Sequence, residues 1–159
     1  ALTETVLSPY TCGGNPRNLA TRLDNLYVNY YDSVVFQYTD QPAPLTAMTP
    51  AFVAATGNSL ACAVVGDYFY RYEDTYDHIY RYSFAASGGG LESPLAVSSV
   101  LPDVTQLIGG IGGKVLYSVH PNVDRIDCFS ITASTGELGS QVEKSTADVP
   151  ICLAIVKAQ

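Results

Sequence analysis

The chain has 159 residues, of which 47% are apolar and 14% are charged, so it is too apolar for a disordered chain and long enough for one domain with a buried core. Its formal net charge of −7 would repel a phosphate backbone, so nucleic acid is not expected as a partner. No apolar run approaches the roughly 18 residues that a membrane-spanning helix needs, so no membrane partner is expected either.

Short runs of β-branched and aromatic residues alternate with clusters of Gly, Pro, Asn and Asp, and long amphipathic helix patterns are absent. This alternation predicts an all-β fold. We expect strands, in chain order, at 1–8, 18–21, 26–31, 33–39, 45–53, 59–65, 68–72, 78–84, 91–99, 105–108, 115–119, 125–131, 138–144 and 151–156.

Four kinds of anchor recur along the chain with one common period. An aromatic pair opens a strand at Leu26-Tyr27, Phe69-Tyr70 and Leu116-Tyr117. An Asp stands two residues before a β-branched residue at Asp32, Asp77 and Asp124. A Leu follows a turn-like segment at Leu45, Leu91 and Leu138, and another lies in a short strand at Leu19, Leu60, Leu107 and Leu153. The period is about 46 residues, which falls in the range of propeller blades.

Four short strands in each unit of this period predict four-stranded antiparallel β-propeller blades. We expect one domain over 1–159, with blades at about 18–53, 59–99 and 105–144 and half a blade at each end, 1–8 and 151–156. Because three blades leave two open sheet edges, the chain is expected to be part of a larger or oligomeric propeller. Another copy or a complementary chain would complete it.

Several segments resemble the lactonase-like, or YVTN-type, propeller family. The third unit resembles it best, with Leu116-Tyr117, Asp124-Arg125-Ile126 and Thr135-Gly136-Glu137-Leu138. The segment Cys12-Gly13-Gly14-Asn15-Pro16 is similar to a blade-opening turn of fungal members that resemble muconate cyclases. The resemblance implies a propeller fold and, as one alternative, lactone hydrolysis or a cyclase-type reaction, although a fold does not define an activity.

In a propeller the loops between second and third strands lie on the same face as the loops that enter the inner strands, and loops on a rigid scaffold often carry function. The chain has 12 tyrosines, and a tyrosine ring with its polar tip suits a binding surface, although strand propensity alone explains most of them. The candidate binding residues on this face are Tyr30, Tyr31, Tyr76, His120, Asn122 and Arg17.

Catalytic signatures are sparse. Arg17 could polarise a lactone while Glu73 or His120 acts as the base, although a plain loop histidine is the commoner interpretation of His120. Glu73, Asp74 and Asp77 could bind a cation, but solvated loop carboxylates are commoner. The Asp that recurs in each unit is expected to be a turn residue. No cofactor is expected, and the glycine cluster at 109–113 does not support a nucleotide site, because it lies between two strands with no helix after it.

The four cysteines, Cys12, Cys62, Cys128 and Cys152, allow two disulfides in any of three pairings, and free buried thiols are about equally expected. The chain begins with Ala1, which is compatible with a secreted mature chain or with a processed cytoplasmic one; we expect the secreted form.

Three functions remain open from the sequence. The favoured one is a binding or assembly module that presents tyrosine-rich loops to a partner, a glycan or another small molecule. The alternatives are a lactonase or cyclase-type enzyme and a purely structural subunit that pairs through its edge strands. The lack of an evident orienting partner for either histidine favours binding over catalysis.

Overall fold

The computed structural model describes residues 15–31, 34–39, 46–54, 57–86, 89–96, 98 and 100–155. Within these ranges twelve strands form three antiparallel sheets, each with its four strands side by side in chain order. Blade 1 contains β1 (Pro16–Arg22), β2 (Asn25–Tyr30), β3 (Val34–Thr39) and β4 (Thr46–Ala54). Blade 2 contains β5 (Ala61–Val65), β6 (Tyr68–Glu73), β7 (His78–Ser83) and β8 (Leu95–Ala96). Blade 3 contains β9 (Gln106–Gly109), β10 (Val115–His120), β11 (Arg125–Ile131) and β12 (Leu138–Ser145).

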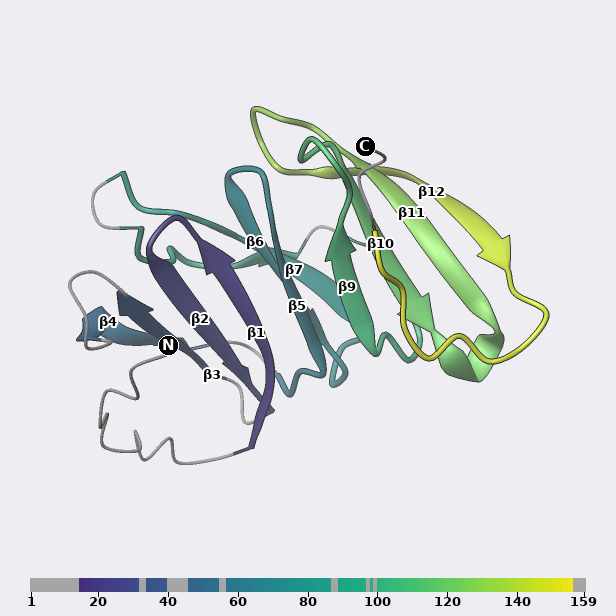
Figure 1. Ribbon diagram of the computed structural model, residues 1–159, viewed down its shortest axis with the longest axis horizontal. Coiled ribbons are helices and arrows are strands. Elements are labelled where there is room, and N and C mark those ends of the chain that lie inside the picture. The colour runs from purple at the N-terminus through teal and green to yellow at the C-terminus, as the bar shows by residue number, and fades with distance from the viewer. Residues whose placement is uncertain are drawn as a thin grey trace, which may run out of the picture.

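The three sheets fan out as consecutive propeller blades (Figure 1). The first strands of the blades lie toward the centre, where β5 contacts both β1 and β9. The predicted all-β fold of four-stranded blades is therefore confirmed. A single turn of 3-10 helix, η1 (Pro121–Val123), joins β10 to β11, and no helix in the described residues is long and apolar enough to cross a membrane.

The recurring Asp is a turn residue in both described units. Asp77 and Asp124 have φ of 55° and 48°, a left-handed conformation that Asp tolerates better than most residues. Their main-chain carbonyls accept hydrogen bonds from the amides of Leu101 and Thr146, at 2.7 Å each. Each Asp therefore bends the chain between the second and third strands and holds the segment that leaves the blade. Asp32, like Leu45 and the predicted strand 1–8, lies outside the described residues.

The strand register corrects one anchor of the repeat. Leu19 pairs with Val28, and Leu107 pairs with Ser118, at equivalent positions of blades 1 and 3. In blade 2 that position belongs to Cys62, which pairs with Arg71. Leu60 precedes β5 and is not its equivalent. The predicted anchor in blade 2 was therefore wrong by two residues. Residues two apart in a strand point to the same face of the sheet, so the apolar pattern of the sequence does not distinguish the two positions.

Two predicted strands differ from the structure. Over its described residues, 91–96 and 98, the strand predicted at 91–99 forms only a bridge between Phe84 and Leu91 and the two residues of β8, because a loop with Ser93 and Pro94 interrupts it. The strand at 151–156 is not formed over its described part, residues 151–155. Instead the amide and the carbonyl of Leu153 bond to the side chain of Gln106 on β9.

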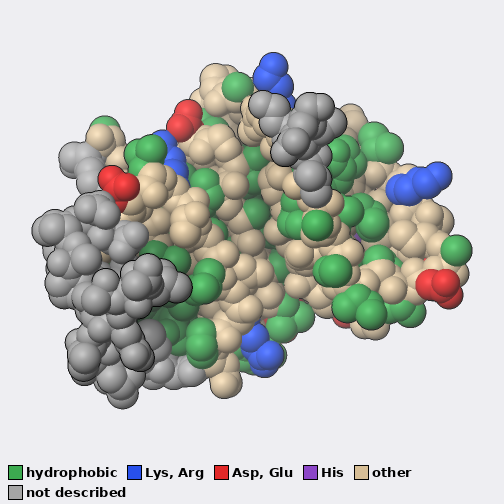
Figure 2. Space-filling view, viewed as in Figure 1, with side chains coloured by type: hydrophobic (Ala, Val, Ile, Leu, Met, Phe, Trp, Pro, Cys, Tyr) green, Lys and Arg blue, Asp and Glu red, His purple; other side chains and the backbone are tan. Residues whose placement is uncertain are grey.

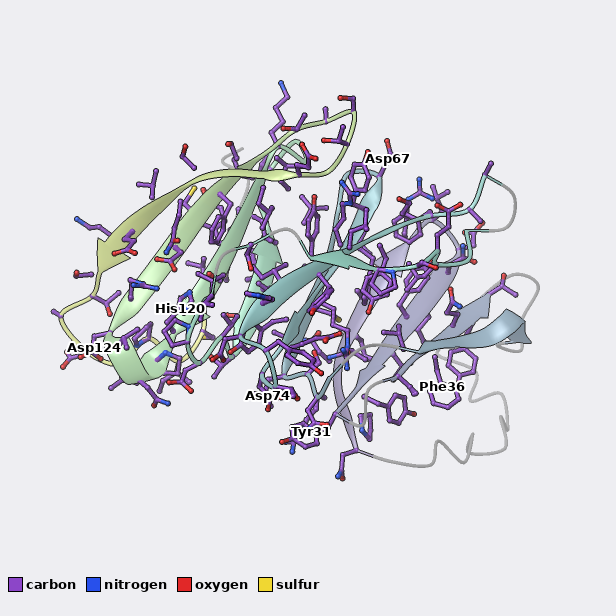
Figure 3. The ribbon with its side chains drawn as sticks, turned by 180° about the vertical axis from the view of Figure 1, so that it is seen from behind. Tyr31, Phe36, Asp67, Asp74, His120 and Asp124 are labelled. Carbon is purple, nitrogen blue, oxygen red and sulfur yellow. The ribbon has the colours of Figure 1, made fainter. Side chains whose placement is uncertain are left out.

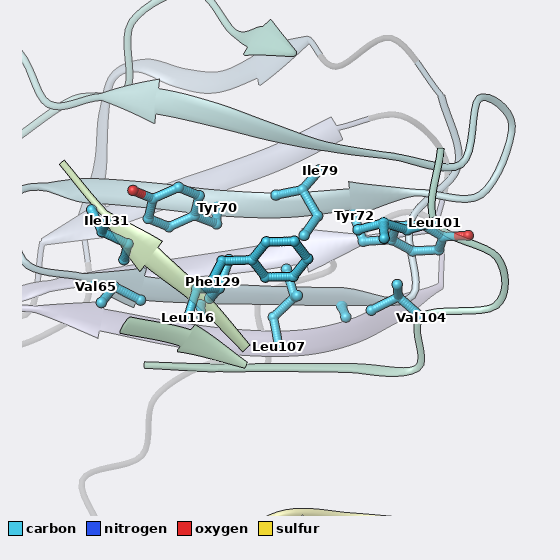
Figure 4. Close-up of a cluster of buried hydrophobic side chains, with 12 residues drawn as sticks. Val65, Tyr70, Tyr72, Ile79, Leu101, Val104, Leu107, Leu116, Phe129 and Ile131 are labelled. Atoms are coloured by element: carbon cyan, nitrogen blue, oxygen red, sulfur yellow. The ribbon is translucent and has the colours of Figure 1, made fainter. Parts of the chain in front are cut away.

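Apolar and aromatic side chains between successive blades form the core. Tyr70 and Tyr72 of blade 2 pack on Leu107, Leu116 and Phe129 of blade 3 (Figure 4). A second cluster joins blades 1 and 2 and includes Tyr27, Val35, Cys62, Phe69, Tyr82 and Leu91. Because side chains alternate along a strand, blade 2 packs one face of its sheet against blade 1 and the other face against blade 3. Most of the buried tyrosines therefore serve the core, as strand propensity alone would suggest.

Strongly alkaline solution is expected to unfold the protein through these tyrosines. Burial raises the pKa of the Tyr70, Tyr72 and Tyr82 hydroxyls above their ordinary value near 10, and the Asp77 carboxylate adds to this at Tyr72. A raised pKa means that the folded state holds these protons more tightly than the unfolded state, so stability is full below about pH 10 and falls above it. Urea unfolding followed at pH 8, 10 and 11 should show this fall, and an unchanged midpoint would contradict it.

Candidate functional site

The loops between the second and third strands are joined to the loops that enter the inner strands. The amide of Tyr31 donates to the carbonyl of Asn15 at 2.9 Å, and the amide of Ser59 donates to the carbonyl of Tyr31 at 3.2 Å. The amide of Asp74 likewise donates to the carbonyl of Asn58 at 2.9 Å. Tyr31, Asp74 and Asp124 all lie along one edge of the molecule in Figure 3. We call this edge the loop face.

Four of the six predicted binding residues have side chains that reach solvent on this face. Arg17 is exposed and places its guanidinium 5.2 Å from the ring centroid of Tyr31, within the range of a cation–π contact. Tyr76, in the β6–β7 turn, is 51% exposed. Asn122, in η1, is also exposed. The loop face thus presents aromatic and polar groups from all three blades.

The other two predicted binding residues are interior. Tyr30 is the last residue of β2 and is buried, with its ring 4.9 Å from that of Phe36. His120 is the last residue of β10 and is buried as well. Each side chain turns into the sheet, although each residue adjoins an exposed loop. Placing these two on the contact surface was wrong, because each is the last residue of its strand and its side chain is buried in the sheet.

A buried ionic network connects blades 1 and 2 around Arg71 of β6. Its Nη1 donates to Oε1 of Glu73 at 2.6 Å, and both side chains are fully buried. Its Nε donates to Oδ1 of Asn29 at 2.8 Å, and its Nη2 donates to the carbonyl of Tyr30 at 3.2 Å. The Asn29 amide in turn donates to Oγ of Ser59 at 3.0 Å. The network holds the ends of both second strands beneath the loop face.

Glu73 is therefore a structural ion-pair partner rather than an exposed carboxylate. The metal candidates Glu73, Asp74 and Asp77 do not form a ligand set, since the Asp77 carboxylate accepts the Tyr72 hydroxyl at 2.7 Å. Across the described ranges, no three His, Cys, Asp or Glu side chains converge as metal ligands. The three carboxylates that the sequence left as weak candidates for a cation site are therefore not brought together, because Glu73 pairs with Arg71 and Asp77 accepts the Tyr72 hydroxyl.

A second buried network surrounds His120 within blade 3. Its Nε2 lies 2.7 Å from Oγ of Ser118 and 2.9 Å from Oδ2 of Asp127. Its Nδ1 lies 2.7 Å from the carbonyl of Pro102, which can only accept a hydrogen bond. Arg125 adds a further ion pair to Asp127 at 2.9 Å. Burial raises the pKa of the Asp127 carboxyl, while the charges of His120 and Arg125 oppose that rise.

These residue types are those of a hydrolase triad, but the geometry is not. In a triad the histidine contacts the serine through one ring nitrogen and the carboxylate through the other. Here Ser118 and Asp127 share the same nitrogen, and all three side chains are buried. The network therefore fixes the end of β10. Asp127 is the orienting partner of His120 that the sequence did not show, but the His120 side chain is buried and does not reach solvent.

Three of the cysteines, Cys62, Cys128 and Cys152, are free thiols in the structure. Cys62 is buried beside the Arg71 network, and burial raises its pKa to about 12, against an opposing effect of Arg71. A thiol with so high a pKa is not a nucleophile at neutral pH. Cys12 lies outside the described residues.

The fold is similar to that of solved β-propeller structures, among them proposed 6-phosphogluconolactonases. The chain superimposes on a proposed 6-phosphogluconolactonase from Bacteroides fragilis with a TM-score of 0.73 at 19% identity, covering 86% of this chain and 40% of that one. A protein from Lactobacillus plantarum matches with a TM-score of 0.66 at 14% identity, over 86% of this chain and 43% of that one. A proposed 6-phosphogluconolactonase from Bacteroides uniformis gives 0.59 at 18% identity, over 84% and 43%.

At this level of identity the likeness shows the fold alone. The chain spans less than half the length of these solved structures. No family model matches the sequence, and no curated protein matches it either. The resemblance to lactonase-like propellers noted in the sequence is thus confirmed as a resemblance of architecture.

Proposed function

We propose that the protein is a β-propeller binding module whose contact surface is the loop face, formed by Arg17, Tyr31, Tyr76 and Asn122. The observation that carries this proposal is that the acid–base groups near the loop face are buried, whereas its aromatic and hydrogen-bonding groups reach solvent. The acid–base groups at the strand ends, Glu73 and His120, are fully buried in ion pairs. The exposed groups of the same face are suited to contact rather than to proton transfer.

The chemistry of the surface favours a neutral or weakly anionic polyhydroxylated ligand such as a glycan. Tyr31 and Tyr76 offer rings on which a sugar face can stack. Arg17 and Asn122 offer hydrogen-bond donors for hydroxyl groups. Main-chain hydrogen bonds tie the Tyr31 segment to the inner-strand entries, so the surface is held by rigid elements, which limits the entropy lost on binding.

Binding can be measured by NMR titration with a panel of mono- and oligosaccharides. We expect shift changes at Tyr31 and Tyr76, and a loss of affinity of about tenfold or more in the Tyr31→Ala/Tyr76→Ala double variant, since each aromatic contact contributes about 1 kcal/mol. Ile111→Ala is the matched control, because Ile111 is exposed in the β9–β10 turn at the other end of the strands. Identical affinities of the double variant and the wild type would contradict the proposal.

Lactone hydrolysis is the second candidate, favoured by the structural similarity to proposed 6-phosphogluconolactonases. It would need a base that meets the substrate, and Glu73 and His120 lack such access. We therefore expect the pure protein to leave the spontaneous hydrolysis of 6-phosphogluconolactone unchanged. An acceleration that Arg17→Ala removes while the fold stays intact would make the enzyme the better assignment.

A further inference from the structure

The two ring nitrogens of His120 both face oxygen atoms in the interior of the protein. Nδ1 lies 2.7 Å from the carbonyl of Pro102, which can only accept a hydrogen bond, so this contact requires a hydrogen on Nδ1. Nε2 lies 2.9 Å from Oδ2 of Asp127, and an ionised carboxylate also only accepts. A neutral histidine beside an ionised carboxylate therefore supplies one hydrogen too few for the two contacts. We call His120 and Asp127 the buried pair.

Both neutral forms of the ring leave two acceptors in contact. A ring with its hydrogen on Nδ1 would point the Nε2 lone pair at the Asp127 carboxylate, and a ring with its hydrogen on Nε2 would point the Nδ1 lone pair at the Pro102 carbonyl. The Ser118 hydroxyl, 2.7 Å from Nε2, can donate to that nitrogen but places no hydrogen between Nε2 and Oδ2. Because all three side chains are fully buried, an unsatisfied contact of this kind is costly.

The charges around the buried pair favour an additional proton. Arg125 forms ion pairs with Asp127 at 2.9 Å and with Glu143 at 3.1 Å, so two carboxylates face one guanidinium. One proton shared between His120 and Asp127 balances these charges. Burial also raises the pKa of the Asp127 carboxyl, although the charges of His120 and Arg125 oppose this rise. A raised pKa means that the folded protein holds a proton more tightly than the unfolded chain does.

The other polar groups that neighbouring elements bring to this region are engaged elsewhere or reach solvent. The Tyr72 hydroxyl of blade 2 donates to the Asp77 carboxylate at 2.7 Å. Asp103, in the segment 101–105, is exposed. Gln141 of β12 donates to Oδ2 of the buried pair at 2.9 Å but cannot take up a proton there. Among these described groups, the buried pair is thus the one whose proton determines the local contacts.

The buried pair contacts the segment 101–105, through which the chain passes from blade 2 into β9. The Pro102 carbonyl meets the His120 ring, and the Leu101 amide donates to the carbonyl of Asp77 at 2.7 Å. Asp77 belongs to the β6–β7 turn, so the segment is one of the inner-strand entries tied to the loop face. His120 lies at the end of blade 3 that carries the loop face (Figure 3).

We propose that the buried pair is a pH-sensitive clamp on the segment 101–105, which holds one shared proton in the folded protein and loses a contact to Pro102 or between its own members when that proton passes to solvent. The inference does not depend on what the loop face binds. A histidine of the unfolded chain releases its proton at about pH 6.5. The stability that the clamp supplies is therefore full below that pH, and it is lost as the pH rises toward the value at which the folded pair releases its proton.

NMR of the 159-residue chain at pH 7.5 tests the proton directly. An isolated histidine is about 90% neutral at this pH, but the ring-nitrogen shifts of His120 and the carboxyl-carbon shift of Asp127 should together show one proton on the pair. Asp127→Asn is the matched variant, because its amide can donate to Nε2 without an ionisable group, so its His120 should be neutral. A neutral His120 ring beside an ionised Asp127 in the wild type would overturn the proposal, as would an imidazolium that persists in Asp127→Asn.

The pH dependence of unfolding gives an independent result. Between pH 7 and 8 the unfolding equilibrium constant of the wild type should rise by up to about tenfold per pH unit, because one proton leaves on unfolding. This rise should be absent in Asp127→Asn, or in His120→Gln if that variant is the one that folds. His78→Gln removes the other histidine of the chain and should keep the wild-type rise. Equal pH dependence in the wild type and the pair variants would contradict the shared proton.

The segment itself reports whether the pair acts as a clamp. The amide resonances of Leu101 and Val104, whose side chains are fully buried, should shift with pH in step with the His120 ring in the wild type and stay fixed in Asp127→Asn. Segment resonances that do not move while the pair loses its proton would overturn the clamp.

Discussion

Replacing Arg71 by methionine is expected to destabilise the fold by about 3–5 kcal/mol, because the change leaves a buried carboxylate without its ion-pair partner. Arg71 and Glu73 are both fully buried, and Arg71 also satisfies Asn29 and the carbonyl of Tyr30. Urea unfolding monitored by tyrosine fluorescence gives the free energy, and the chain contains no tryptophan to obscure that signal. A loss below about 1 kcal/mol would contradict the structural role of the network.

The double variant Arg71→Met/Glu73→Leu separates the ion pair from its surroundings. Removing both charges replaces the pair with apolar side chains, so part of the stability lost in Arg71→Met should return. Arg22→Met is the exposed control, because the Arg22–Asp67 pair is 2.9 Å long but its Asp67 side chain is largely in solvent. Its expected cost is about 0–1 kcal/mol. If the double variant were less stable than Arg71→Met, Glu73 would stabilise the fold through interactions other than its ion pair with Arg71.

Replacing Leu116 by alanine is expected to cost about 2–5 kcal/mol through the lost burial and the cavity left behind. Leu116 is fully buried between blades 2 and 3, where it belongs to the same cluster as Tyr70 and Phe129. Tyr70→Ala should cost a similar amount and also removes the hydrogen bond from the Tyr70 hydroxyl to the Gly136 carbonyl in blade 3. The control is Val142→Ala on β12, where the side chain is 63% exposed and the cost should stay within about 0.5 kcal/mol. Equal costs at Leu116 and Val142 would contradict the packing of blade 3 on blade 2.

The repeat was readable in the sequence because it is local. The aromatic pairs open β6 and β10, and Asp77 and Asp124 form turns, since strand alternation and turn chemistry depend on neighbouring residues. The loop face followed from the same repeat. The error at Leu60 arose because a shift of two residues keeps the apolar pattern, and only the pairing of Cys62 with Arg71 distinguishes the two registers.

The buried networks were not readable because their partners come from elsewhere in the fold. From the sequence alone, Arg71 resembles a solvent-facing residue of β6. Only the fold shows that Asn29 of blade 1 accepts a hydrogen bond from it. Asp127 looks like a polar residue of an outer-facing strand, but His120 and Arg125 surround it. A charged residue between two aromatic ones, as in Tyr70-Arg71-Tyr72, was the available signal. Charges in such a context are rarely left unpaired when buried.

Solution NMR of the 159-residue chain tests the central claim most directly, namely that three blades pack in chain order with blade 2 between the other two. Phe69 and Tyr70 are neighbours in β6, yet their rings face different blades. We predict contacts between the rings of Phe69 and Tyr27, whose centroids are 5.8 Å apart. We also predict contacts from the Tyr70 ring to the methyl groups of Leu116 or Ile131. Contacts of both rings with one and the same blade, or with neither, would contradict the propeller arrangement.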